Sequence, residues 1–162
     1  MGASYAAPPV TAVHNLPHVD YAGQCMRIHE LRQRLREAGA GPSHEHRILR
    51  LWSHALPRDS GKRRPASFFP SALLAALPSI EAELAGLARI HAVHPGADGS
   101  ERLLVALADG QTVESVLLPR DGLCVSSQVG CAVGCRFCMT GRDALLRQLG
   151  RAGIIAQIAL AR

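Results

Sequence analysis

Apolar residues recur at three- and four-residue spacings through the first half of the chain, which predicts amphipathic helices. In the first of them, Ile28, Leu31 and Leu35 form one stripe, with arginines on the other face and glycines directly after it. Ser43 is the expected cap of a second helix, whose apolar stripe runs from Ile48 to Leu56. The predicted helices span residues 24–38, 43–56, 71–77 and 79–87, preceded by a loose, proline-containing leader at 1–23.

The pattern changes after residue 88, where alternation of apolar and polar residues predicts strands at 89–94, 102–108 and 112–118. Asp98-Gly99 and Asp109-Gly110 separate these strands, and Asp-Gly favours a tight two-residue primed turn. We therefore expect a β-meander. After a turn at 119–122 we expect a strand at 124–128 and a helix at 144–161, which two glycines interrupt.

Composition narrows the class of protein only a little. The chain has 162 residues, 48% of them hydrophobic but only 4% aromatic, so its core is built of leucine and alanine. The net charge of +5 permits an RNA partner, although such a charge is equally typical of an ordinary soluble protein. Basic residues gather in the predicted loop 57–65, where they could contact RNA phosphates or simply face solvent. No signal peptide or membrane-length apolar run is seen, so we expect no membrane partner and a cytoplasmic protein.

The candidate chemistry lies in Cys131-Ala-Val-Gly-Cys135-Arg-Phe-Cys138. Three thiolates on one short loop can bind three irons of a cubane 4Fe–4S cluster and leave the fourth iron open to a small molecule. Zinc is an alternative, because Cys124 could complete a set of four thiolates. A disulfide framework is disfavoured by the odd count of five cysteines and by the absence of a secretory signal.

The stretch 123–141 resembles, almost residue for residue, the RlmN/Cfr family of radical S-adenosylmethionine (SAM) RNA methyltransferases. The segment 109–119, with Glu114, is similar to the strand that enters the family's cluster loop. The resemblance implies a 4Fe–4S cluster held by Cys131, Cys135 and Cys138, with SAM on the open iron and Phe137 near its adenine. It also implies that Cys124 resolves a covalent protein–RNA intermediate and that Glu114 is catalytic.

The partners implied by this resemblance are RNA, namely an adenine of 23S ribosomal RNA and also transfer RNA, and an electron donor for the cluster. The fold implied is α+β. It comprises the leader 1–23, a small helical accessory domain at 24–88, a β-meander at 89–122 and the start of a radical SAM partial α/β barrel at 123–162. In that barrel a strand leads through the cluster loop directly into a helix.

Two features depart from the family pattern. Just past the cysteines, Ala144, Gln148 and Gly153 stand where family members have other residues, which suggests a divergent paralogue or a decayed copy. A barrel of six βα units needs on the order of 200 residues, so we expect a truncated barrel, with the second reactive cysteine beyond Arg162. Three hypotheses stay open: an RNA methyltransferase, a catalytically incomplete fragment that binds a cluster or RNA, and a small zinc- or cluster-binding module. On this basis the 162 residues alone are not expected to methylate RNA.

Overall fold

The computed structural model describes residues 26–142 and 144–162, and its helices and strands form an α+β fold. The helices are α1 (Ile28–Glu37), α2 (Pro42–Ser53), α3 (Pro65–Phe68), α4 (Ser71–Ala85) and α5 (Arg151–Leu160). The strands are β1 (Ala88–Pro95), β2 (Glu101–Leu107), β3 (Thr112–Leu118), β4 (Gly122–Cys124), β5 (Gln128–Gly130) and β6 (Leu145–Gln148). The predicted leader and the first two residues of the predicted helix 24–38 lie outside the described residues.

The first two helices follow their apolar stripes. Leu31 and Leu35 of α1 are fully buried, and α2 buries Ile48 against them in the same core. The predicted cap of α2 is wrong. Gly41 is the N-cap, and its N–H donates to Nδ1 of His44 at 3.0 Å. Pro42 can occupy the first helical position because that residue's N–H would have no partner in the helix.

The two helices predicted at 71–77 and 79–87 form one continuous helix, α4, with Pro78 inside it. Pro78 has no N–H to donate to the preceding turn, which ordinarily breaks a helix. The buried residues nevertheless continue at helical spacing across the proline: Leu73, Leu77, Ile80 and Leu84. Packing of this stripe in the core outweighs the lost hydrogen bond, and Pro78 itself lies on the exposed side.

The predicted meander is confirmed as an antiparallel sheet with the order β1-β2-β3-β4. The first three strands, β1, β2 and β3, all begin and end within one residue of the predicted bounds. The expected primed turns are wrong. Gly99 and Gly110 have φ of +81° and +82°, whereas the aspartates before them keep negative φ. Each connection is instead a turn followed by a left-handed glycine, and the aspartate side chain accepts a backbone hydrogen bond two residues on.

The chain after Gly122 departs most from expectation. The predicted strand 124–128 is divided: β4 ends at Cys124, and β5 begins at Gln128 in a separate two-stranded sheet. The predicted helix 144–161 is wrong over its first part, because residues 145–148 form β6, antiparallel to β5. All strand pairs in the described ranges are antiparallel. The expected direct step from strand through loop to helix is also wrong, because β6 lies between the cysteine loop and α5. The hairpin β5–β6 comes before α5.

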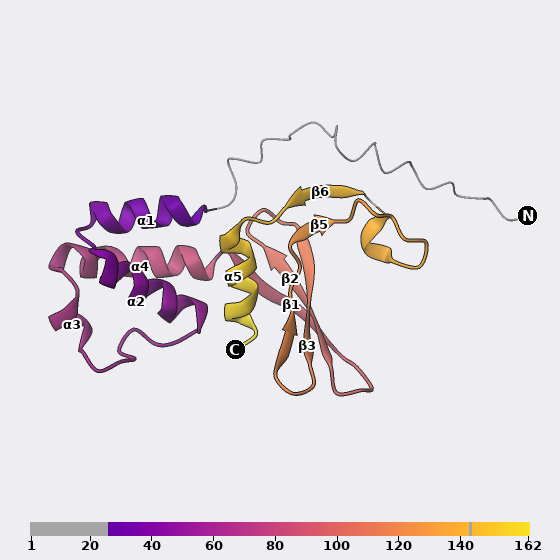
Figure 1. Ribbon diagram of the computed structural model, residues 1–162, viewed down its shortest axis with the longest axis horizontal. Coiled ribbons are helices and arrows are strands. Elements are labelled where there is room, and N and C mark those ends of the chain that lie inside the picture. Colours follow the sequence, from indigo (N-terminus) through magenta and orange to yellow (C-terminus); the bar gives the residue numbers. More distant parts are fainter. Residues whose placement is uncertain (1–25, 143) are drawn as a thin grey trace, which may run out of the picture.

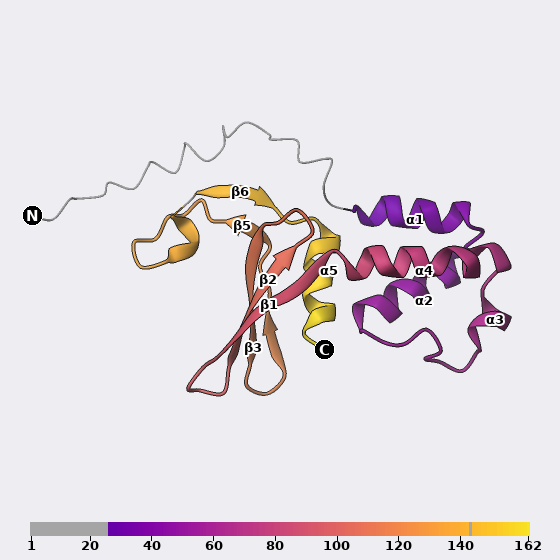
Figure 2. The same cartoon turned by 180° about the vertical axis from the view of Figure 1, so that it is seen from behind.

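The helices α1–α4 and the strands lie on opposite sides of α5 in both views of the molecule (Figures 1 and 2). α5 contacts both α2 and β1. One hydrophobic core cluster runs through all three regions, from Leu31 in α1 through Leu84 in α4 to Val105 in β2 and Ala156 in α5. The division into domains at residues 23, 88 and 122 stays a prediction. No helix in the described part of the chain is long and apolar enough to cross a membrane.

Candidate functional site

The cysteine loop, which the structure describes over residues 131–142 and at Ala144, is closed at its base by the hairpin of β5 and β6 (Figure 1). The Cys131 N–H donates to the Ala144 carbonyl at 3.1 Å. Gly130, at φ +75°, packs so closely on this carbonyl that any Cβ would overlap it. Within the loop, a Cβ on Gly141 would lie 2.8 Å from the Cα of Gly134, which itself has φ +61°. Glycines therefore permit both close approaches that fold the loop back on itself.

The three cysteines of the motif are half-buried free thiols within this loop. The Cys138 N–H donates to the Cys135 carbonyl at 3.0 Å, and the Val133 N–H points at Sγ of Cys131 at 3.5 Å. The pKa of the Cys138 thiol is lowered because the Thr140 hydroxyl and backbone N–H donate hydrogen bonds to the sulfur. A lowered thiol pKa favours the thiolate, which is the form that binds metals.

The loop supplies free thiols, but in the described residues these thiols are not assembled into a metal site. Across residues 26–142 and 144–162, no three His, Cys, Asp or Glu side chains converge as they would around a bound metal ion. Cys124 is exposed and is not gathered with the motif cysteines into a four-thiolate set. Three apolar side chains of the loop also face solvent: Val133, Met139 and Phe137, the last of which is 92% exposed.

Glu114 and Cys124 lie on the same open face of the meander. Cys124 pairs with Val116 in the antiparallel register, and Glu114 precedes Val116 by two residues, so the three side chains share one face. Both Glu114 and Cys124 are exposed, and the nearest counter-charge to Glu114 is the exposed Arg102 at 3.8 Å. The charge of Glu114 raises the pKa of Cys138, against the larger effect of Thr140. The two residues predicted from the sequence thus share one face, and Glu114 lies within electrostatic range of Cys138.

Sequence reasoning missed two buried polar contacts, one that joins the hairpin to the meander and one that joins α5 to the meander and to the segment between β4 and β5. Arg147 of β6 forms an ion pair with Asp109, in the turn between β2 and β3, and both side chains are less than a tenth exposed. Gln157 of α5 is fully buried and hydrogen-bonds Ser115 and Ser126. The sequence carried a sign of the second contact, because Gln157 interrupts the apolar stripe of its helix.

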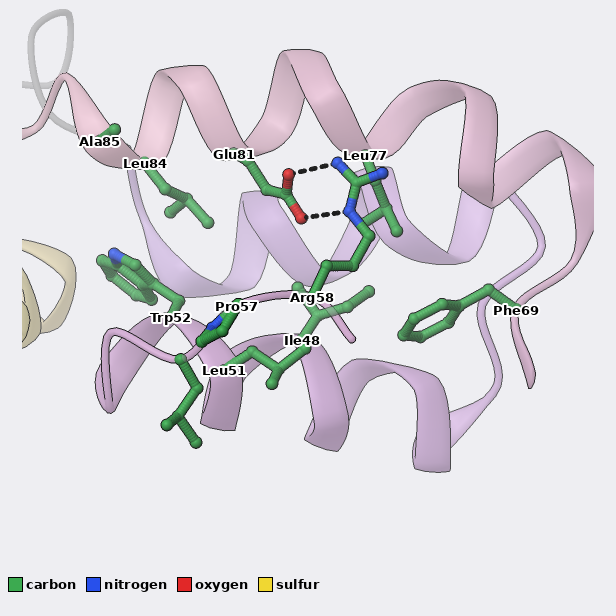
Figure 3. A pocket seen from close by; sticks show the side chains of 11 residues that line it. Ile48, Leu51, Trp52, Pro57, Arg58, Phe69, Leu77, Glu81, Leu84 and Ala85 are labelled. Carbon is green, nitrogen blue, oxygen red and sulfur yellow. Dashed lines mark hydrogen bonds and ion pairs between the residues drawn. The ribbon is translucent and has the colours of Figure 1, made fainter. Parts of the chain in front are cut away.

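A separate pocket of about 260 Å³ opens in the helical part, between α2, α4 and the segment 56–58 (Figure 3). Its walls are mostly apolar, and Arg58 crosses it to form a bidentate pair with Glu81 of α4. Arg58 is therefore engaged within the fold. None of the site residues predicted from the sequence lines this pocket.

The basic loop 57–65 is held in shape from inside by Arg47. Its guanidinium donates to the carbonyls of Ser60 at 3.2 Å and Arg63 at 2.8 Å, and it lies over the Phe68 ring at 4.8 Å. Lys62, Arg63 and Arg64 are exposed on the outside of this loop.

Comparison with known proteins finds similar chains that are named methyltransferases. No protein-family model matches the chain. The chain is 66% identical over 137 residues to a protein of Leptothrix cholodnii named a probable RNA methyltransferase, and 68% identical over 137 residues to one of Aromatoleum aromaticum with the same description. These matches cover 85% of this chain and 40% and 38% of the two relatives.

The fold is similar to the crystal structure of a radical SAM methyltransferase from Sphaerobacter thermophilus, with a TM-score of 0.56 and 29% sequence identity. That similarity covers 84% of this chain and 40% of the other, so the chain spans about two fifths of the length of the proteins it matches. The chain is accordingly a relative of probable RNA methyltransferases by sequence and of a radical SAM methyltransferase by fold, which confirms the resemblance that the cysteine motif indicated.

Proposed function

We propose that this chain forms the cluster-binding part of a radical SAM RNA adenine methyltransferase of the RlmN/Cfr type. Cys131, Cys135 and Cys138 are the ligands of a 4Fe–4S cluster. These three thiolates would hold the cluster, and Phe137 would lie beside the adenine of bound SAM. Such a cluster supplies the electron that cleaves SAM to a 5′-deoxyadenosyl radical. The observation that carries the proposal is the placement of all three thiols on one loop whose two ends are fixed by the β5–β6 hairpin.

The residues of the loop fit this cofactor chemically. The three thiols are free and half-buried, and the hydrogen bonds from Thr140 favour the thiolate of Cys138. The open face of the meander next to the loop carries Glu114 and Cys124, where an RNA base could approach from solvent. In our proposal, a second cysteine carries the covalent RNA adduct, and the Cys124 thiolate attacks the sulfur of that cysteine. An S–S bond forms while the S–C bond to the RNA breaks, the electron pair of the S–C bond leaves with the substrate carbon, and Glu114 exchanges a proton with the substrate.

RNA is the proposed substrate, from 23S ribosomal RNA or transfer RNA, and an electron donor reduces the cluster. The exposed side chains of Lys62, Arg63 and Arg64 are proposed to contact RNA phosphates. Arg47 supports this role, because its hydrogen bonds hold the loop backbone in one shape before RNA arrives. A preformed loop loses less conformational entropy on binding.

Metal content after anaerobic reconstitution with iron and sulfide tests the proposed cofactor. We expect about four irons per chain in the wild type, and a large loss of iron in the variants C131A, C135A and C138A. C124A is the matched control, since it removes a nearby thiol that is not a proposed ligand, and its iron content should stay unchanged. One tightly bound zinc per chain that is lost in C124A would instead establish the four-thiolate zinc site.

Salt-dependent RNA binding tests the proposed phosphate contacts. The variant K62A/R63A/R64A should weaken binding to an RNA hairpin and reduce the slope of log affinity against log salt by about two to three, if each side chain meets one phosphate. R89A/R120A/R151A removes the same charge from exposed positions elsewhere. Equal losses in the two variants would mean that only net charge matters and would refute a defined contact surface.

A further inference from the structure

Gln157 is a fully buried polar side chain at the junction of α5, the meander and the cysteine hairpin. Its Oε1 accepts hydrogen bonds from the Ser115 hydroxyl at 2.9 Å and the Ser126 N–H at 3.0 Å. Its Nε2 donates to the Ser126 carbonyl at 2.9 Å and to the carbonyl of Gly153, in its own helix, at 3.1 Å. The amide therefore uses both of its donors and two acceptor sites.

The contact with Ser126 replaces a strand pair at the place where the chain changes sheets. β4 ends at Cys124 and β5 begins at Gln128, so the residues between them lie outside both sheets. The N–H and C=O of Ser126 both bond to the Gln157 amide, as they would to a residue of a neighbouring strand. One side chain thus supplies the backbone hydrogen bonds that the sheet cannot supply there.

The same amide is connected to both residues of the open face. Ser126 follows Cys124 by two residues, and its hydroxyl donates to the Glu114 carbonyl at 2.6 Å. Ser115, the other residue bound by Gln157, is the neighbour of Glu114 in β3 and points to the opposite, buried face. Gln157 therefore lies behind the sheet and holds the backbone on which Glu114 and Cys124 stand.

We propose that Gln157 is a positioning residue of the site. Its amide fixes the crossing segment 125–127 against β3, and so sets the place of Cys124 relative to Glu114 and to the start of the cysteine loop. The inference rests on the proposed function, in which Cys124 and Glu114 serve the reaction beside the cluster loop. A residue that only filled the core would stabilise the fold equally well as an apolar side chain, whereas a positioning residue needs the amide.

Three variants of the full chain separate these roles. Q157M keeps the length of the side chain but has no amide, so it removes the hydrogen-bond partner of the Ser126 N–H, the Ser126 carbonyl and the Ser115 hydroxyl. Q157E keeps an oxygen that can accept from the Ser126 N–H but loses the donors and buries a charge. I154A removes packing from the same helix, where Ile154 packs partly buried against the core, without touching the hydrogen bonds of Gln157.

Amide hydrogen exchange of the metal-free protein, followed by NMR, is the measurement. In Q157M, the Ser126 N–H should exchange at least about tenfold faster than the loss of global stability explains, with I154A as the reference. The amide signals of Glu114 and Cys124 should shift in Q157M. In Q157E, the Ser126 N–H should be protected as it is in the wild type, even though the free energy of unfolding stays below the wild-type value. Protection that simply follows global stability in all three variants would overturn the proposal.

Iron content, measured in parallel on reconstituted wild type, distinguishes the two proposals. A wild type that binds no iron–sulfur cluster refutes the proposed function and leaves the exchange result at Ser126 valid as a test of Gln157. If the wild type binds about four irons but exchange of the Ser126 N–H in Q157M only follows global stability, the positioning role alone is refuted.

Discussion

The ion pair between Asp109 and Arg147 ties the hairpin that carries the cysteine loop to the turn between β2 and β3. Only 6% of the Asp109 side chain and 8% of the Arg147 side chain are exposed. Asp109 also accepts from the Gln111 N–H at 3.1 Å, so its carboxylate serves the turn and the ion pair together. The substitution D109N preserves the shape of the side chain and the acceptor for Gln111 but removes the charge that faces Arg147.

The expected cost of D109N is about 3 kcal/mol, because the variant leaves a buried guanidinium without its counter-charge. For a chain of this length each kcal/mol lowers the melting temperature by about 2–4 °C, which gives a fall of about 6–12 °C. R147M should cost a similar amount by leaving the carboxylate unpaired. The double variant D109N/R147M should cost less than the sum of the two, with a coupling energy of about 2 kcal/mol.

Urea unfolding of the four proteins in this cycle measures these free energies. R34M is the control, because Arg34 pairs with Glu83 at 2.6 Å but both side chains are about 40% exposed. That exposed pair should contribute less than about 1 kcal/mol. Additive effects of D109N and R147M, or a cost of D109N no larger than that of R34M, would show that the pair does not hold the hairpin to the meander.

Three further predictions concern single positions. G130A should prevent the hairpin from closing, because residue 130 has a positive φ and its new methyl group would overlap the Ala144 carbonyl. Iron content after reconstitution should therefore fall, and an unchanged iron content would argue against a fixed loop base. T140V should raise the pKa of Cys138, because it removes the hydroxyl donor. Iodoacetamide should then alkylate this thiol in metal-free protein only at higher pH, and an unchanged pH profile would contradict the assigned hydrogen bond. P78A should raise the free energy of unfolding by about 1–3 kcal/mol, because it restores a helix hydrogen bond at an exposed position. A lower free energy of unfolding would show that the proline is needed for the shape of α4.

The sequence alone determined the parts of this protein whose structure depends on near neighbours. The helical stripes of α1 and α2 and the alternation in β2 and β3 each follow from a local period, and the structure confirms them. The cysteine loop could also be recognised from the sequence, because its proposed chemistry needs three thiols at short spacing on one segment. The family resemblance followed from that loop and was confirmed by comparison.

Local sequence patterns gave wrong predictions where packing or pairing with a distant segment decides the structure. Residues 145–148 could continue a helix by composition, but the backbone of β5 lies beside them and makes β6 instead. Pro78 should end a helix, yet a stripe of buried leucines on both sides of it keeps α4 continuous. In both places the energy of packing or pairing with a distant segment exceeds the local preference.

The arrangement of the candidate site was decided by tertiary structure. Glu114 and Cys124 were identified from the motif, but only the register of β3 and β4 places them on one face. Gln157 lies 31 residues from Ser126 and 42 from Ser115, and Arg147 lies 38 from Asp109. A sequence shows which groups need hydrogen bonds or counter-charges once buried, but the partners of those groups are chosen only when the chain folds and removes them from water.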